Sequence, residues 1–166
     1  ILVAVLSGRI MKLSFAAAFS MFLLYAAVNG ITFALIFVLY TGESIWATFL
    51  ITGVTFGAMA LYGRFTKTDL TQFRSVLFMG LIGVVVLSIV NIFLNSDPLG
   101  WIISIVGLFV FLGLTAYDTQ KLKGYYYATD GQMALRQNLG VMGALSLYLD
   151  FINLFLKLLR LFGRRK

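Results

Sequence analysis

The chain has 166 residues, of which 61% are hydrophobic and only 11% charged, and its formal net charge is +7. A soluble domain averages roughly 45–50% apolar and about 25% charged residues, and a fold of this size cannot hide so much apolar surface from water. The composition therefore argues against a soluble enzyme, a disordered tail or a secreted disulfide scaffold, and it indicates an integral membrane protein. The sequence has no His and no Cys, which removes Ser-His triads, cysteine nucleophiles, disulfides and zinc sites with His or Cys ligands.

Apolar runs of about 20 residues predict five membrane-spanning helices, because a helix of that length crosses the hydrocarbon core. The predicted spans are approximately 13–40, 44–63, 75–94, 99–118 and 139–159. Gly63 and Gly124 are placed where two of the helices are expected to stop. The apolar run 1–7 is interpreted as the end of a helix whose beginning lies upstream. The expected fold is one transmembrane domain over 1–166, an all-α polytopic helical bundle.

Basic residues predict which side of the membrane each connector faces. Connectors 8–12, 64–74 and 119–138 contain bases, whereas the turns at Glu43 and Asp97 contain an acid and no base. The positive-inside rule therefore places the three basic connectors in the cytoplasm and the two acidic turns outside. Five bases near the C-terminal end break this alternation. The last segment is thus expected either to return to the cytoplasm as a re-entrant helix or to cross as a packed central helix against the charge bias.

Two acidic residues, Asp118 and Asp150, are predicted to lie at membrane depth. A carboxylate in the bilayer costs at least about 2.5–3.5 kcal/mol on insertion scales, so its default interpretation is functional. The alternatives are a helix-end acid at the interface and a structural hydrogen-bond anchor. Asp118 lies about eight residues, or roughly 12 Å, inside the tyrosine run 125–127, and Asp150 lies ten residues, or roughly 15 Å, beyond Gly140. Because the two helices are consecutive and antiparallel, both carboxyl groups can lie at one level.

Each of the two acids belongs to a polar stripe at helical spacing, and such a stripe faces protein or water rather than lipid. The supporting polar residues in these stripes are Thr115, Ser146 and Asn153. Three bases near helix ends are long enough to reach inward as candidate partners of the acids: Arg9, Lys12 and Lys157.

Two carboxyl groups at one depth can share a proton and titrate as a unit, which would make Asp118 and Asp150 a proton switch without histidine. Paired carboxylates are also candidate ligands for a hard cation such as Ca²⁺ or Mg²⁺, because these metals prefer oxygen. The pair is therefore the predicted pH-sensing and gating site, and a candidate Ca²⁺ site.

The stretch Gly143–Phe155 (GALSLYLDFINLF), followed by Leu158-Leu159-Arg160, resembles the signature of the Bax inhibitor-1, or transmembrane Bax inhibitor motif, family. Tyr117-Asp118-Thr119-Gln120 resembles the other hallmark of that family. Tyr62-Gly63 with 66–70 resembles a loop common in its bacterial members. The resemblance covers nearly the whole chain, and the short loops and basic ending are more similar to the bacterial inner-membrane branch.

This resemblance implies a seven-helix membrane protein with a central last helix, of which this chain would lack the first helix and most of the second. It also implies a calcium leak that is regulated by pH through two aspartates, which match Asp118 and Asp150. No cofactor is expected apart from Ca²⁺ as a transported or bound ion. The expected partners are the lipid bilayer, Ca²⁺, protons and, in one alternative, a membrane protease, with no nucleic acid.

Three functions are compatible with these observations. The first is a pH-gated Ca²⁺ leak channel or exchanger built around Asp118 and Asp150. The second is an intramembrane aspartyl protease, which fits poorly because Leu147-Tyr148-Leu149 before Asp150 lacks the glycines that let a peptide backbone approach; the chain is therefore not expected to be an enzyme. The third is a regulatory membrane protein that binds a membrane protease or stress factor without transporting ions.

Overall fold

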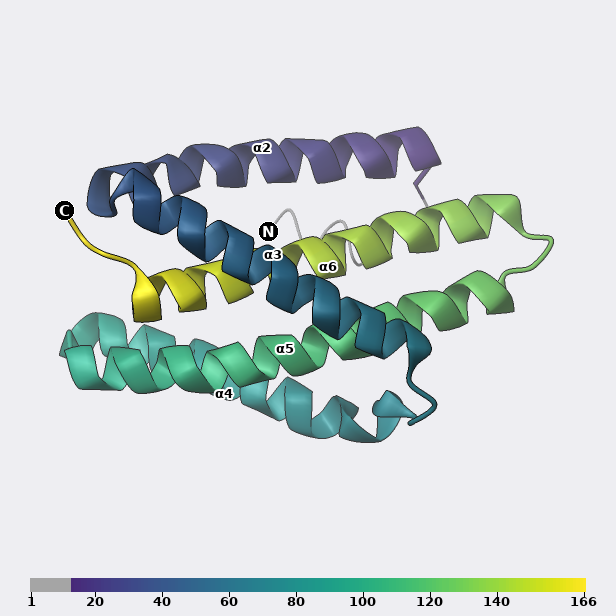
Figure 1. The fold of residues 1–166 in the computed structure, drawn as a ribbon. Helices are drawn as coiled ribbons and strands as arrows, with labels where there is room; N and C mark the ends of the chain where they lie inside the picture. Colours follow the sequence, from purple (N-terminus) through teal and green to yellow (C-terminus); the bar gives the residue numbers. More distant parts are fainter. Residues whose placement is uncertain (1–12) are drawn as a thin grey trace.

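The computed structural model describes residues 13–166, which form five long helices and one short 3-10 helix (Figure 1). In chain order they are α2 (Phe15–Leu39), α3 (Gly42–Phe65), η2 (Leu70–Phe73), α4 (Arg74–Leu94), α5 (Asp97–Ala128) and α6 (Met133–Phe162). The described residues contain five helices long and apolar enough to cross a membrane and no β-strand. The chain is therefore an all-α polytopic membrane protein, as its composition predicts. The run 1–7, Arg9 and Lys12 lie outside the described residues.

The last helix, α6, is central among the described helices, and it packs against α2, α3 and α5. Figure 1 shows α2 on one side of α6 and α5 on the other, and α3 crosses α6 and α5. α5 and α6 run antiparallel and form the most extensive helix contact, while α4 packs on α5. The α5–α6 contact therefore joins the two helices that carry Asp118 and Asp150.

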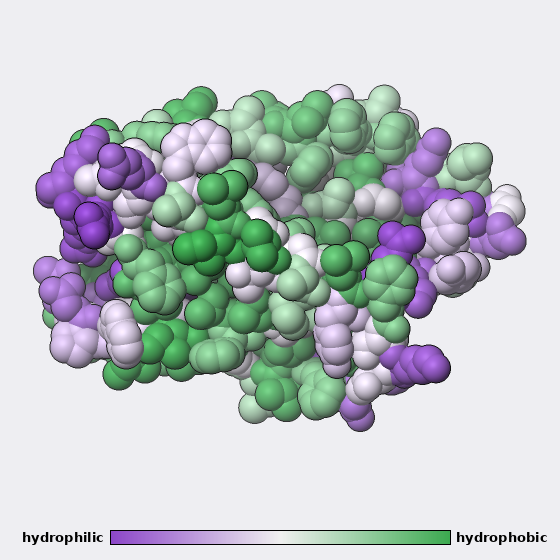
Figure 2. All heavy atoms as spheres, in the orientation of Figure 1, coloured by the Kyte–Doolittle hydropathy of each residue, from purple (hydrophilic) through white to green (hydrophobic). Residues whose placement is uncertain are grey.

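The surface of the molecule matches the two environments of a bilayer. Figure 2 shows apolar side chains across the middle of the molecule and hydrophilic ones gathered at its two ends. Many large apolar side chains are exposed, and Phe93 on α4 is 83% exposed. Such exposure would be costly in water but is favourable against lipid tails. One small buried cluster, Phe111 with Leu154 and Leu158, lies between α5 and α6, and a second, around Ala18, lies between α2 and α6.

Gly63 is a packing residue rather than the end of a helix, which corrects the prediction from sequence. α3 continues to Phe65, and Gly63 lies directly on the backbone of Ala116 in α5. A Cβ at this position would lie 2.8 Å from both the carbonyl carbon and the Cα of Ala116. The lack of a side chain thus lets α3 and α5 approach closely, as small residues do in membrane proteins.

The connector predicted at 119–138 is much shorter in the structure. α5 continues through Gly124 to Ala128, and α6 begins at Met133, so only 129–132 form the turn. The Thr129 hydroxyl donates a hydrogen bond of 2.8 Å to the Tyr125 carbonyl, which satisfies a group at the end of α5. Apolar runs locate only the part of a helix that lies in hydrocarbon, and the polar final turns of α5 extend beyond that part.

α6 crosses the whole bundle as one continuous helix, so the re-entrant alternative is wrong. Residues 164–166, the C-terminal clasp, lie beside the turn between α2 and α3 (Figure 1). Four hydrogen bonds hold the clasp: Thr41 N–H to Arg164 O at 3.0 Å, Arg164 N–H to Ser44 Oγ at 2.8 Å, Lys166 N–H to Leu39 O at 3.0 Å, and Lys166 Nζ to Phe37 O at 2.7 Å. The C-terminal bases therefore share one end of the bundle with Glu43, which lies in the first turn of α3.

Candidate functional site

Asp118 and Asp150 face each other across the contact between α5 and α6. Their carboxyl groups lie within hydrogen-bonding reach of each other. Asp150 is 4% exposed, and Asp118 is half-buried. The structure thus brings together the two acids that the sequence placed at one depth, in the interior of the bundle rather than on its lipid-facing surface.

A hydrogen bond between the two carboxyl groups requires a proton on one of them. Asp150 Oδ2 is buried without a hydrogen-bond partner among the described residues. An ionised carboxylate can only accept hydrogen bonds, so two ionised groups at this distance repel each other. One shared proton converts the same contact into a hydrogen bond. The pair is therefore chemically suited to hold and release one proton.

A hollow of about 10 Å³ lies beside Asp118 on the side of the α5–α6 turn. Its lining includes Lys121, Tyr125 and Ser146. This volume is close to the least that holds one water molecule. Lys121 is near enough for its charge to act on the Asp118 carboxyl group, and its Nζ lies 5.6 Å from the centroid of the Tyr125 ring. The hollow thus places room for about one water molecule between Asp118 and a basic side chain.

The three predicted supporting residues take different positions. Ser146 lines the hollow beside Asp118. The buried Thr115 hydroxyl donates to Phe111 O at 2.8 Å, and Asn153 Nδ2 donates to Leu149 O at 2.8 Å. Thr115 and Asn153 therefore satisfy their polar groups within their own helices, while Ser146 is the one that shares a surface with the acid.

Lys157 does not approach the pair, contrary to the expectation from its position in the polar stripe. Its side chain lies over Gly107 of α5, where a Cβ would be 2.8 Å from Lys157 Cε. Gly107 precedes Asp118 by 11 residues, which is about 16 Å along the helix. The stripe correctly places Lys157 on the α5-facing side of α6, but the long stem follows the notch at Gly107. Lys121, which was not predicted as a partner of the acids, is the base beside Asp118.

Gln120 connects the loop before α4 to α5, two residues after Asp118. Its Oε1 accepts a hydrogen bond of 2.8 Å from Leu70 N–H, and its Nε2 donates one of 2.9 Å to Thr68 O. Gln120 was not predicted as a functional residue, although it stands in the same short motif as Asp118. The segments 62–70 and 117–120, both singled out by resemblance to family motifs, therefore meet in space beside the acid pair.

A Ca²⁺ ion at the pair would need further ligands. Within residues 13–166, no group of three or more His, Cys, Asp or Glu side chains comes together. Ca²⁺ takes six to eight oxygen ligands. Asp118 and Asp150 could therefore supply only part of a coordination sphere, with hydroxyl, carbonyl or water oxygens completing it.

The fold and the site define a polytopic helical membrane protein with a buried carboxyl pair between two adjacent spans. The family model described as "Inhibitor of apoptosis-promoting Bax1" matches residues 1–166. The chain is 52% identical over 167 residues to the inner membrane protein YbhL of Escherichia coli (strain K12), an alignment that covers 99% of this chain and 71% of that protein. The chain therefore belongs to the Bax inhibitor-1 family.

Other relatives are bacterial too. The chain is 46% identical over 165 residues to an uncharacterized protein of Borreliella burgdorferi, covering 99% of this chain and 71% of the relative. It is 45% identical over 164 residues to an uncharacterized membrane protein of Streptococcus pyogenes serotype M3, covering 99% and 70% respectively. Together with the five helices long enough to span a bilayer, these relatives identify a multi-pass protein of the bacterial inner membrane.

Proposed function

We propose that this protein is a pH-sensitive calcium leak channel or exchanger of the inner membrane, gated by Asp118 and Asp150. The observation that supports this proposal is the buried contact between two carboxyl groups on adjacent spans. Ionisable groups inside a membrane are costly and commonly mark ion or proton pathways. The resemblance to the Bax inhibitor-1 family supplies the choice of calcium. An enzymatic role is not part of the proposal.

The shared proton would act as a latch between α5 and α6. With one proton on the pair, a hydrogen bond between carboxyl and carboxylate holds the two helices together. With no proton, two negative charges in a medium of low dielectric repel each other unless a cation compensates. Lys121 is placed to compensate part of this charge at Asp118.

Protons and Ca²⁺ would compete for the same oxygens. The doubly ionised pair attracts Ca²⁺, so Ca²⁺ binding weakens as the pH falls and the pair takes up a proton. The latch also controls whether α5 and α6 separate, and so binding and conduction can respond to pH in opposite directions. The hollow lined by Lys121 and Ser146 has room for one water molecule that could exchange a proton with Asp118. It lies on the side of the pair nearer the connector 119–138, which the basic residues predict to be cytoplasmic.

Calcium flux in liposomes tests the proposal. The purified protein is reconstituted at two external pH values, and Ca²⁺ entry is followed with an enclosed indicator dye. Asp118→Asn and Asp150→Asn should each abolish the pH dependence, because an amide exchanges no proton in this range and a coupled pair fails when either member is lost. Asp97→Asn, at an exposed acid in the first turn of α5, is the matched control and should keep it.

Two results would contradict the proposal. If the double Asn variant keeps normal pH-dependent Ca²⁺ flux, the two acids are structural and the latch is wrong. If the wild-type protein conducts no Ca²⁺ at either pH, the transport function fails. A regulatory protein that binds a membrane protease or stress factor would then be the better hypothesis, with partner capture that survives loss of both acids.

A further inference from the structure

A second polar hollow lies between the C-terminal end of α3 and the last turns of α5, separate from the acid pair. Its volume is about 420 Å³, which falls in the usual range of roughly 300–1,000 Å³ for small-ligand sites. Its lining residues are Arg64, Thr119, Leu122, Lys123, Tyr126 and Tyr127. We propose that this hollow, the α3–α5 hollow, binds the phosphate headgroup of an anionic phospholipid.

The two bases of the α3–α5 hollow carry uncompensated charge. Lys123 Nζ donates a hydrogen bond of 2.9 Å to Arg64 O, which fixes the ammonium group at the end of α3 and leaves its other N–H donors available. The Arg64 guanidinium lies over the Phe65 ring, 5.6 Å from its centroid. Within residues 13–166, neither base forms an ion pair with an acid. Two adjacent cations without an acidic partner favour a bound anion.

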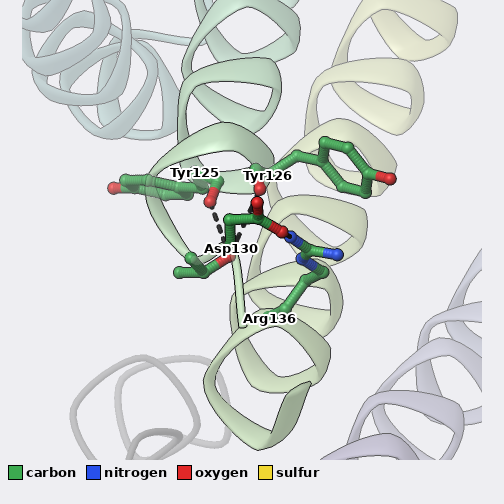
Figure 3. Close-up of polar contacts among 5 residues, drawn as sticks. Tyr125, Tyr126, Asp130 and Arg136 are labelled. Carbon is green, nitrogen blue, oxygen red and sulfur yellow. Dashed lines mark hydrogen bonds and ion pairs between the residues drawn. The ribbon is translucent and has the colours of Figure 1, made fainter. Parts of the chain in front are cut away.

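The aromatic wall of the α3–α5 hollow consists of Tyr126 and Tyr127, and neighbouring side chains hold it in place. The Arg136 guanidinium lies 4.4 Å from the centroid of the Tyr126 ring, and Arg136 Nη2 is 3.0 Å from Asp130 Oδ1 (Figure 3). Tyr127 meets the Tyr126 ring edge to face, with 5.6 Å between centroids. Tyr126 nevertheless remains 57% exposed. These contacts organise the wall before any ligand binds, so little entropy is lost on binding.

The position of the hollow favours a lipid over a soluble anion. Lys123 lies five residues beyond Asp118, about 7.5 Å closer to the polar end of α5. On α3, beside Arg64, Phe65 is 71% exposed and Leu61 is also exposed, so apolar surface adjoins the two bases. A phospholipid can therefore place its phosphate on the bases and its acyl chains along α3. Basic pockets between spans on the cytoplasmic side are a recognised arrangement for anionic headgroups.

Lipid binding to the purified full chain can be measured by native mass spectrometry, with phosphatidylglycerol as the anionic lipid and phosphatidylcholine as the neutral one. Phosphatidylglycerol should bind more tightly. The double variant Arg64→Gln/Lys123→Gln should bind it about 30-fold more weakly, since each base near an anionic surface contributes roughly a fivefold gain. The matched control is Lys67→Gln/Arg74→Gln, which removes the same charge from two exposed bases at the same end of the bundle and should change binding less than twofold.

Several results would overturn the proposal. Equal binding of the two lipids, or an equal loss in both double variants, would mean that no specific site exists. Inorganic phosphate that displaces phosphatidylglycerol at equal concentration would assign the hollow to a soluble anion instead. If circular dichroism shows that Arg64→Gln/Lys123→Gln has lost helix, Lys123→Gln alone is measured, and a loss of less than twofold rejects the site. None of these outcomes depends on calcium flux, so the headgroup site and the proposed function can fail independently.

Discussion

Replacing Gly63 with alanine is expected to push α3 away from α5 beside the acid pair. The new Cβ would lie 2.8 Å from the carbonyl carbon and Cα of Ala116, and it would overlap the Ala116 carbonyl oxygen. Because the obstacle is backbone, only a shift of a whole helix can relieve it. Overpacking of this kind costs about 1–3 kcal/mol, from which a gain in helix propensity of about 0.5–1 kcal/mol is subtracted. With the middle of each range, the net loss of stability should be about 1 kcal/mol, or roughly 2–4 °C in melting temperature.

Thermal unfolding in detergent, followed by circular dichroism, measures this effect. Gly57→Ala is the matched control, because it makes the same change in the same helix at a position where a Cβ would have no heavy atom within 4 Å. That variant should unfold at the wild-type temperature or slightly above it. If Gly63→Ala is as stable as Gly57→Ala, the close approach of α3 and α5 at Ala116 is not a constraint, and the reasoning is refuted.

Three further predictions concern the ends of the bundle. Gln120→Leu should lower stability by about 2 kcal/mol, because it loses two hydrogen bonds. Gln120→Glu keeps the acceptor for Leu70 N–H and should therefore lose less stability. Equal melting temperatures of the two variants would contradict this prediction. Hydrogen bonds from the side chain and the backbone N–H of Thr71 hold the pKa of Asp69 below its ordinary value of 3.8. A carboxyl group with a lowered folded-state pKa stabilises the fold at neutral pH and loses that effect as the pH falls through the lowered value. Carbon-detected NMR titration of the folded protein measures the pKa of Asp69. A value of 3.8 or above would contradict the prediction. Deleting 164–166 should lower the free energy of unfolding by about 2 kcal/mol, because it removes the C-terminal clasp. Arg165→Gln is the control and should lower it by almost nothing. Identical thermal unfolding of the two proteins would show that the clasp is not stabilising.

The sequence alone determined the class of the protein and the two acids of its candidate site. Apolar runs of sufficient length have to be membrane spans, because their composition is incompatible with water. Asp118 and Asp150 were recognisable because a carboxylate within such runs carries a large energetic cost. Both signals are local, so they can be read without knowledge of which helices are neighbours.

Only the tertiary structure decided how the helices meet. The bases near the C-terminal end left the path of the last segment open, and the packing of α6 against α2, α3 and α5 resolved it as a crossing helix. The role of Gly63 became visible only with Ala116 opposite it, and the position of Lys157 only with Gly107 beneath it. These features depend on the register between helices that are far apart in the chain. Close contacts of backbone and side chain set that register. Hydropathy and charge counts cannot predict it, because they report only the environment of each segment.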